Sequence, residues 1–218
     1  MLALLVQVGA PDTLHIRVIP SLPPTASSLA PDAMSAPGSA AGPPLLGPPS
    51  VRISTGQGLA EVWLQRSADS VALTAWIPDT SYYWGDDFVV SLDLGRERGS
   101  APQDDDFQWY LRRMLDSSVV YRGRGGRWVA PRGDPDWRLG KERSGAGWAV
   151  DSRSDRTGWH LSLRMDAAFF RGQGGFPAAI GFRIYDDAPS GWFAWPSVSG
   201  GAVATLVERT PALWVPVR

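Results

Sequence analysis

Cysteine is absent from this 218-residue chain, and histidine occurs only twice, as His15 and His160. The absence of cysteine excludes disulfide frameworks, thiolate chemistry and cysteine-based zinc sites. Two histidines this far apart in sequence exclude a histidine-rich metal centre, and neither lies in a sequence context typical of a Ser-His-Asp triad. We therefore expect no cofactor and no metal.

An excess of charge of one sign is also missing, because 21 Lys and Arg residues stand against 22 Asp and Glu residues. A net charge of −1 provides no field that would attract nucleic acid, so we expect no nucleic-acid partner. Long apolar runs are missing too, since none reaches the roughly 18 residues of a membrane span.

The opening residues MLALLVQVGA are apolar but lack the basic start and the length, about 15–30 residues, of a signal peptide. We expect them to be retained, as a buried strand or as a foot at a membrane surface. If Met1 is the true start, the protein is expected at the cytoplasmic face of a membrane. If the true start lies upstream, the segment is the end of a signal peptide and the location is extracytoplasmic.

Proline, alanine, serine and glycine dominate residues 20–50, where they supply 24 of 31 positions, nine of them proline. Such a segment cannot form a helix and has little to bury, so it orders only against another surface. We predict an extended, partly polyproline arm. It separates an apolar N-terminal segment with one strand, residues 1–19, from a domain over residues 51–218.

From Val51 onward, apolar and polar residues alternate with a period of two. In Phe88–Leu94 the even-numbered residues are apolar, and the odd-numbered ones include Ser91 and Asp93. This alternation is typical of strands with one buried face, and turn residues separate the runs. We therefore predict an all-β fold, an antiparallel β-sandwich. The other predicted strands are Glu61–Arg66 and Val71–Ile77, which form a hairpin, and Phe107–Arg112, Trp159–Met165, Ile180–Tyr185, Val203–Glu208 and Leu213–Val217.

Two acidic runs, Asp104–Asp106 and Asp186–Asp187, offer the oxygen ligands that calcium prefers. Their spacing matches no calcium loop, so a solvated loop or a strand-end cap is the favoured interpretation. No pair of carboxylates for glycoside hydrolysis is evident, and we do not expect an enzyme. The run RGRGGR, Arg122–Arg127, is similar to RNA-binding segments, but a glycine-rich hairpin turn is the better interpretation.

The tryptophans divide into two groups. One group has apolar neighbours on predicted strands and is expected in the core: Trp63, Trp109 and Trp159. The other group lies beside Gly, Pro and Asp in predicted loops: Trp84, Trp192 and Trp195. Indole rings in loops can stack on sugars, anchor a protein partner or close the ends of a sandwich.

The segment AEVWLQRSADSVALTAWIPDTSYYWGDDFVVSLDL, residues 60–94, resembles the opening of the family 9 carbohydrate-binding modules. The later segments GWHLSLRM, AAIGFRIYDD and GWFAWP resemble late strands and an aromatic loop of that family. The resemblance covers roughly residues 51–218 and implies the same β-sandwich. The positions that carry its opening motif are Asp79, Trp84, Asp86, Asp87 and Asp93.

In that family, two aromatic side chains clamp a terminal sugar, and polar neighbours bind its hydroxyl groups. The resemblance implies that Trp84 and either Trp192 or Trp195 form the clamp. It further implies three polar ligand-binding or partner-binding residues: Asp86, Asp87 and Arg112.

Two non-catalytic functions follow. The favoured one is a structural subunit that binds and stabilises a larger protein assembly, for example a membrane-bound photosynthetic or respiratory complex, through the sandwich and the arm. It explains the arm, and it places the protein at the periphery of a membrane. The alternative is a glycan-binding module that stacks a sugar on loop tryptophans.

Overall fold

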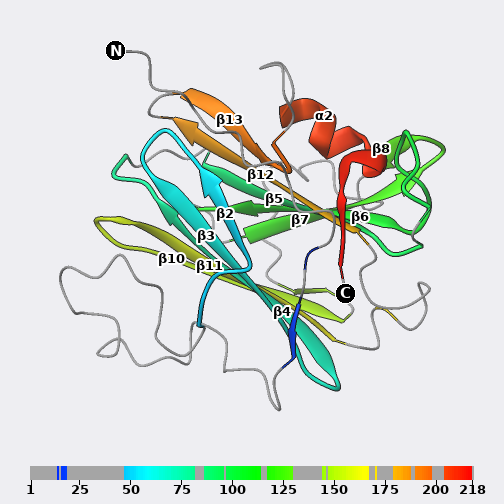
Figure 1. Ribbon diagram of the computed structural model, residues 1–218, viewed down its shortest axis with the longest axis horizontal. Helices are drawn as coiled ribbons and strands as arrows, with labels where there is room; N and C mark the ends of the chain where they lie inside the picture. The colour runs from blue at the N-terminus through cyan, green and yellow to red at the C-terminus, as the bar shows by residue number, and fades with distance from the viewer. Residues whose placement is uncertain are drawn as a thin grey trace.

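The computed structural model describes residues 14, 16–18, 47–81, 86–95, 97–113, 117–129, 144–145, 147–166, 170, 179–187, 190–197 and 204–217. Two seven-stranded sheets lie face to face and form a β-sandwich (Figure 1). Sheet I contains β1 (Arg17–Val18), β2 (Val51–Ser54), β3 (Leu59–Arg66), β4 (Ser70–Pro78), β9 (Ser144–Gly145), β10 (Trp148–Ser154) and β11 (Gly158–Asp166). Sheet II contains β5 (Asp87–Asp93), β6 (Asp106–Arg112), β7 (Ser117–Arg124), β8 (Arg127–Val129), β12 (Ala179–Asp187), β13 (Ser190–Trp195) and β14 (Val215–Pro216).

The core fills the space between the two sheets, and the period-two pattern explains which residues line it. In sheet II, Phe88 and Val90 point inward from β5, while Trp109 and Leu111 do so from β6. Sheet I contributes inward residues such as Leu161, and all five side chains are almost fully buried. The predicted antiparallel sandwich is therefore confirmed.

Sheet I runs in the order β1-β3-β4-β11-β10-β9, and sheet II in the order β13-β12-β5-β6-β7-β8. The predicted hairpin is present, because β3 pairs antiparallel with β4 and Arg66 lies opposite Val71. The RGRGGR run is also a hairpin, between β7 and β8. Its turn residues Gly125 and Gly126 have φ values of +56° and +77°, a region that favours glycine.

The three tryptophans expected in the core are all buried, but they do not share one environment. Trp109 and Trp159 belong to the central core. Trp63 lies outside that core, on the other face of β3, where it is opposite Thr74. Its indole nitrogen donates a hydrogen bond to the Gly47 carbonyl oxygen at 2.8 Å, so residues just before β2 cover it.

The predicted strand at Val203–Glu208 is wrong, because α2 (Ala204–Arg209) occupies most of it. Its sequence ATLVER contains four good helix formers, and Pro211 ends the helical run by starting the short 3-10 helix η4 (Pro211–Leu213). The helix packs on β12 and β13 (Figure 1). Among the described residues, no helix is long and apolar enough to cross a membrane.

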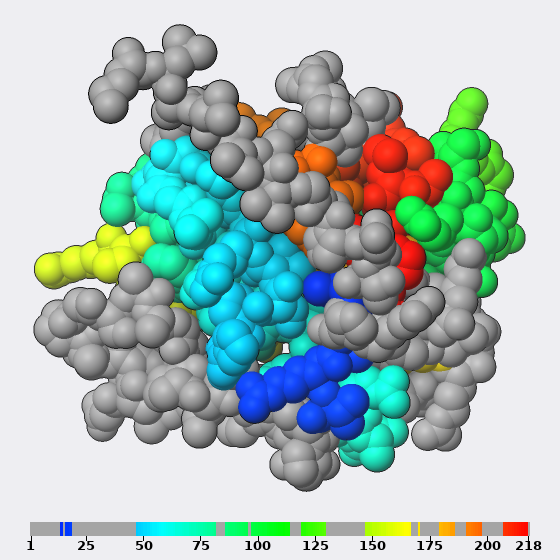
Figure 2. All heavy atoms as spheres, in the orientation of Figure 1, coloured from blue at the N-terminus to red at the C-terminus, as the bar shows by residue number. Residues whose placement is uncertain are grey.

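The N-terminal segment adds to both sheets. The strand β1 pairs with β3 in parallel, and it lies on the surface beside sheet I (Figure 2, dark blue). Just before it, the Leu14 amide donates to the Pro216 carbonyl oxygen at 2.7 Å, and Leu14 forms a parallel bridge with Val217 beside sheet II. Leu14 and Ile16 are buried in the core, so this segment closes one side of the sandwich.

Substitution Ile16→Ala should therefore destabilise the domain, by roughly 2–4 kcal/mol, because it removes a buried aliphatic side chain. Val18→Ala is the matched control, since Val18 is 68% exposed in the same segment and should change the free energy of unfolding by less than about 0.5 kcal/mol. Urea denaturation measures both values. Equal effects of the two substitutions would show that this segment does not pack as described.

Candidate functional site

The outer face of sheet II collects polar and aromatic side chains from four neighbouring strands. Residues directly opposite each other on paired strands share a face. Asp87 of β5 lies opposite Arg112 of β6, and Tyr185 of β12 lies opposite Trp192 of β13. Because Phe88 and Ile184 point into the core, their sequence neighbours Asp87 and Tyr185 point outward.

Arg183 lies at the centre of this face and is 4% exposed. Its guanidinium lies 3.5 Å from the centroid of the half-buried Trp192 ring, which is a close cation–π contact. It also forms an ion pair with Glu208 of α2, and it donates a hydrogen bond to the Tyr110 hydroxyl at 2.9 Å. The Tyr110 hydroxyl donates in turn to Glu208 at 2.7 Å. Arg183 therefore holds the indole in place and ties it to the helix.

Burial raises the pKa of Tyr110, so its phenol stays protonated and remains a donor to Glu208. Both carboxylate oxygens of Glu208 are engaged, one by Tyr110 and one by Arg183. The Tyr185 ring lies 4.9 Å from the Trp192 ring, centroid to centroid, in a tilted arrangement. Tyr185 and Trp192 therefore form an aromatic pair that is held on the paired strands β12 and β13, not on loops.

Asp87 and Arg112 form the polar part of the site. Oδ1 of Asp87 lies 3.5 Å from Nε of Arg112, which is an ion pair but too long for a good hydrogen bond. This oxygen is buried and has no hydrogen-bond partner within the described residues. Burial raises the pKa of Asp87 to about 6, although the charges of Arg112 and Arg183 oppose the shift. Oδ1 of Asp87 therefore has an acceptor capacity that no described residue uses.

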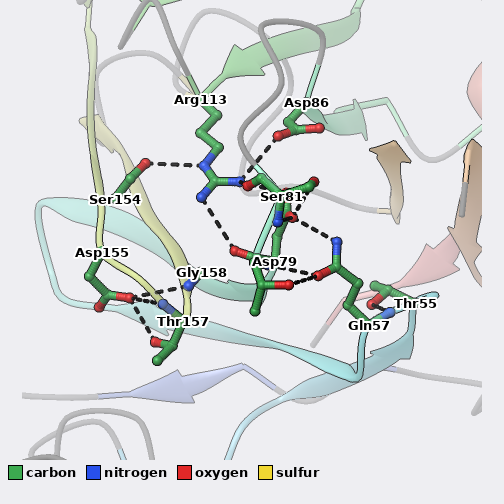
Figure 3. Close-up of polar contacts among 11 residues, drawn as sticks. Thr55, Gln57, Asp79, Ser81, Asp86, Arg113, Ser154, Asp155, Thr157 and Gly158 are labelled. Atoms are coloured by element: carbon green, nitrogen blue, oxygen red, sulfur yellow. Dashed lines mark hydrogen bonds and ion pairs between the residues drawn. The ribbon is translucent and has the colours of Figure 1, made fainter. Parts of the chain in front are cut away.

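Asp86 points away from this face, into a buried cluster around Arg113 (Figure 3). Nη1 of Arg113 lies 2.5 Å from Oδ2 of Asp79 and 3.1 Å from Oδ2 of Asp86, and it also donates to the Ser81 carbonyl oxygen. Nε of Arg113 donates to the Ser154 hydroxyl on β10 at 3.2 Å. The cluster therefore joins the ends of β4 and β10 in sheet I to the residue before β5 and the residue after β6 in sheet II.

The other predicted site residues lie in different places. Trp192 and Trp195 were expected in loops but belong to β13. Trp195 is 9% exposed and packs on Phe182 at 5.6 Å between ring centroids, within the core. Trp84 lies outside the described residues. Of the six predicted residues, the structure brings Asp87, Arg112 and Trp192 to one face.

Several residues of this face were not predicted as site residues: Tyr110, Arg183, Tyr185 and Glu208. The first three lie within the predicted strands Phe107–Arg112 and Ile180–Tyr185 but were not assigned to a site. An arginine and two tyrosines on the solvent side of strands were a usable signal, because such residues are more often found in binding sites than serine or lysine. No sequence signal linked Glu208 to them, since it was assigned to a strand and reaches the face from α2.

Comparison with solved structures finds several chains with this fold, among them two structures of one protein. They are a family 9 carbohydrate-binding module from Caldicellulosiruptor kristjanssonii in complex with glucose and in complex with cellotriose. Each matches with a TM-score of 0.53 and 11% sequence identity, over 94% of this chain and 95% or 92% of the other. The fold is that of the family 9 carbohydrate-binding modules. The predicted resemblance is thus confirmed at the level of the fold.

No protein-family model matches the sequence, and no curated protein matches it. The family 9 fold is therefore supported by the arrangement of the strands, at an identity too low to transfer individual residues.

Substitution Arg113→Met should destabilise this family 9 fold by roughly 3–5 kcal/mol, because it leaves the buried Asp79 and Asp86 without their shared cation. Arg52→Met is the control. Arg52 pairs with Glu61 on the surface, so its loss should cost less than about 1 kcal/mol. Chemical denaturation at pH 7 compares the two, and a small effect of Arg113→Met would contradict the buried cluster.

Proposed function

We propose that this protein is a non-catalytic glycan-binding module whose binding surface is the outer face of sheet II around Trp192, Asp87 and Arg112. The observation that carries the proposal is that a half-buried indole and a buried carboxylate oxygen without a hydrogen-bond partner in the described structure lie on the same face, on strands separated by β12. A sugar offers complementary groups, an apolar C–H face and a set of hydroxyl groups.

The aromatic part of the surface is fixed before any ligand arrives. Arg183 touches the Trp192 ring and is itself anchored by Glu208 and Tyr110, so little side-chain freedom remains to be lost on binding. This preorganisation favours stacking of an apolar sugar face on the indole–tyrosine pair.

The polar part supplies both a hydrogen-bond acceptor and a hydrogen-bond donor. Asp87 accepts, and the Arg112 guanidinium donates, at 3.5 Å from each other. Two adjacent hydroxyl groups of a sugar can each act as donor and acceptor, so one can approach Asp87 while the other approaches Arg112. A site built to hydrogen-bond hydroxyl groups also discriminates against ligands that lack them.

The structural neighbours support the same class of ligand, since the Caldicellulosiruptor kristjanssonii module was solved with glucose and with cellotriose. We therefore propose a β-glucan end or a related gluco-oligosaccharide as the ligand class. Binding rather than hydrolysis is proposed because the carboxylate of Glu208, which contacts this surface from α2, is engaged through both oxygens by Arg183 and Tyr110.

The assembly function predicted from the N-terminal arm, with its membrane-peripheral location, stays a prediction. The arm, residues 20–50, lies outside the described residues except for Gly47–Ser50. The short segment at Leu14–Val18 contacts the sandwich of the same chain and gives no reason to prefer a partner protein.

Trp192→Ala should weaken binding of cellotriose or glucose by about tenfold or more, equivalent to ~1.4 kcal/mol, because it removes the stacking surface. Isothermal titration calorimetry with glucose, cellobiose and cellotriose measures the effect. Trp76→Ala is the matched control, since Trp76 is a partly buried tryptophan on the outer face of sheet I. It should leave affinity unchanged. If the wild-type protein binds no member of a broad glycan panel, the proposal is refuted.

The affinity should also depend on pH through Asp87. The carboxylate is the hydrogen-bond acceptor, and its pKa is about 6, so binding should be constant above pH 7 and weaken as the pH falls through 6. Asp87→Asn should bind more weakly at pH 7 and lose this pH dependence. Asp166→Asn, at an exposed aspartate of sheet I, should keep the wild-type profile. An unchanged profile in Asp87→Asn would remove Asp87 from the site.

A further inference from the structure

The outer face of sheet I, on the side of the sandwich opposite the proposed glycan surface, carries two tryptophans. Trp63 of β3 lies opposite Thr74 of β4, which in turn lies opposite Ser162 of β11. Trp76 of β4 lies opposite His160 of β11, with 6.4 Å between their ring centroids. An antiparallel sheet that faces water usually carries polar residues on its outer side, so two indoles beside small side chains indicate a covered surface.

Two side chains of this face are buried although they point away from the core. Trp63 is 2% exposed and Gln65 is 3% exposed, whereas Leu64 between them points into the core. Oε1 of Gln65 is buried and has no hydrogen-bond partner within the described residues, which is costly unless a donor reaches it. The described helices do not supply this cover, since α2 packs on β12 and β13, and η4 packs on β12, all in sheet II. Trp63 and Gln65 therefore need a further segment as cover.

Both ends of one segment of the chain lie beside these two side chains. The strand β1 pairs with β3, and its Arg17 lies opposite Gln65. The chain is next described at Gly47, whose carbonyl oxygen accepts the Trp63 indole N–H at 2.8 Å. A Cβ atom at Gly47 would collide with the Arg17 guanidinium, so the two ends touch each other. The intervening segment therefore leaves and re-enters the sandwich at the edge of this face.

The intervening segment, residues 19–46, suits an aromatic surface. Seven of its 28 residues are proline, and Asp32 is its single charged residue. Proline-rich chain favours the polyproline conformation, has no internal hydrogen bonds and packs on aromatic-lined surfaces. Fully extended in this form it would span roughly 85 Å. The nine-residue strand β4 is about 30 Å long, so the segment can cross the face and return.

The connection between β8 and β9, residues 130–143, is a poorer match for this face. It re-enters the sheet at β9, four strands from β3 and hence about 19 Å away across the sheet. Half of its 14 residues are charged, which favours contact with water over contact with indole rings. Position and composition both favour residues 19–46 over this connection.

We propose that the outer face of sheet I is a docking surface for proline-rich chain and that residues 19–46 of the same chain occupy it. The segment packs on Trp63 and Trp76, and one of its amide or hydroxyl groups donates to Oε1 of Gln65. Because the segment is tethered at both ends, its effective concentration at the face is high, and weak contacts suffice to hold it. The surface is separate from the proposed glycan surface, which lies on sheet II.

A nitroxide label on the full chain tests the docking. The chain has no cysteine, so one introduced cysteine carries the label at one defined place. Labels at Ser28→Cys and at Ser39→Cys, both within residues 19–46, should broaden the indole N–H signals of Trp63 and Trp76 in NMR spectra. The signals are assigned by replacing each tryptophan with phenylalanine.

Ser100→Cys is the matched control, since this exposed serine lies in the connection between β5 and β6 of sheet II. Its label should leave the signals of Trp63 and Trp76 sharp. If the labels at Ser28 and Ser39 also leave them sharp, the proposal is overturned. Broadening that occurs only in mixtures of spin-labelled and isotope-labelled chains would place the segment on a second copy, and it overturns the proposal as well.

Limited proteolysis gives a second readout. Chymotrypsin should cut residues 19–46 of folded Trp63→Ala at least about tenfold faster than those of the wild type, because cleavage follows the population of the undocked segment. Trp76→Ala should act in the same direction if Trp63→Ala folds poorly. Trp192→Ala, a tryptophan exchange on sheet II, is the matched control and should keep the wild-type rate. Equal rates in Trp63→Ala and Trp192→Ala contradict the docking, whatever the sugar titrations show.

Discussion

The antiparallel pairing of β5 with β6 and β12 is the constraint on which the rest of this molecule depends. Its register makes Phe88, Val90 and Leu92 part of the core and, by alternation, puts Asp87 and Asp93 on the outer face. A slip of one residue would send the apolar set to solvent and bury the charges, so this register is strongly specified. One strand thus positions part of the core and the carboxylates at both of its ends.

Two buried arginines show how the sandwich accommodates charge. Arg113 and Arg183 are each 4% exposed, and each is matched by acidic partners: Asp79 and Asp86 for the first, Glu208 for the second. Desolvation makes such pairs poor sources of net stability compared with apolar packing. Their value lies in position, because Arg113 connects three separate segments and Arg183 fixes an indole ring against a strand.

Much of the fold could be predicted from local pattern. The alternation in Phe88–Leu94 and Trp159–Met165 was long enough to identify β5 and β11, and turn residues identified the β3–β4 and β7–β8 hairpins. The segment at α2 was misassigned because six residues are too few to display a helical period, and its apolar Val207 also suits a strand.

The site was only partly predictable, because it depends on pairing between distant residues. Adjacent residues on a strand point to opposite faces, which separates Asp86 from Asp87 although the sequence places them together. The contact of Arg183 with Glu208, and that of Asp93 with Asp106, join segments whose proximity no local pattern encodes.

The bridge between Leu14 and Val217 means that the polypeptide reaches and leaves the sandwich at one place. The order in which the strands are connected is then separable from the way they pack. A short linker between these two residues would close the chain into a ring, and new ends could be opened at the Gly125–Gly126 turn without breaking a sheet. Such a rearranged chain would present both of its ends at the β7–β8 edge.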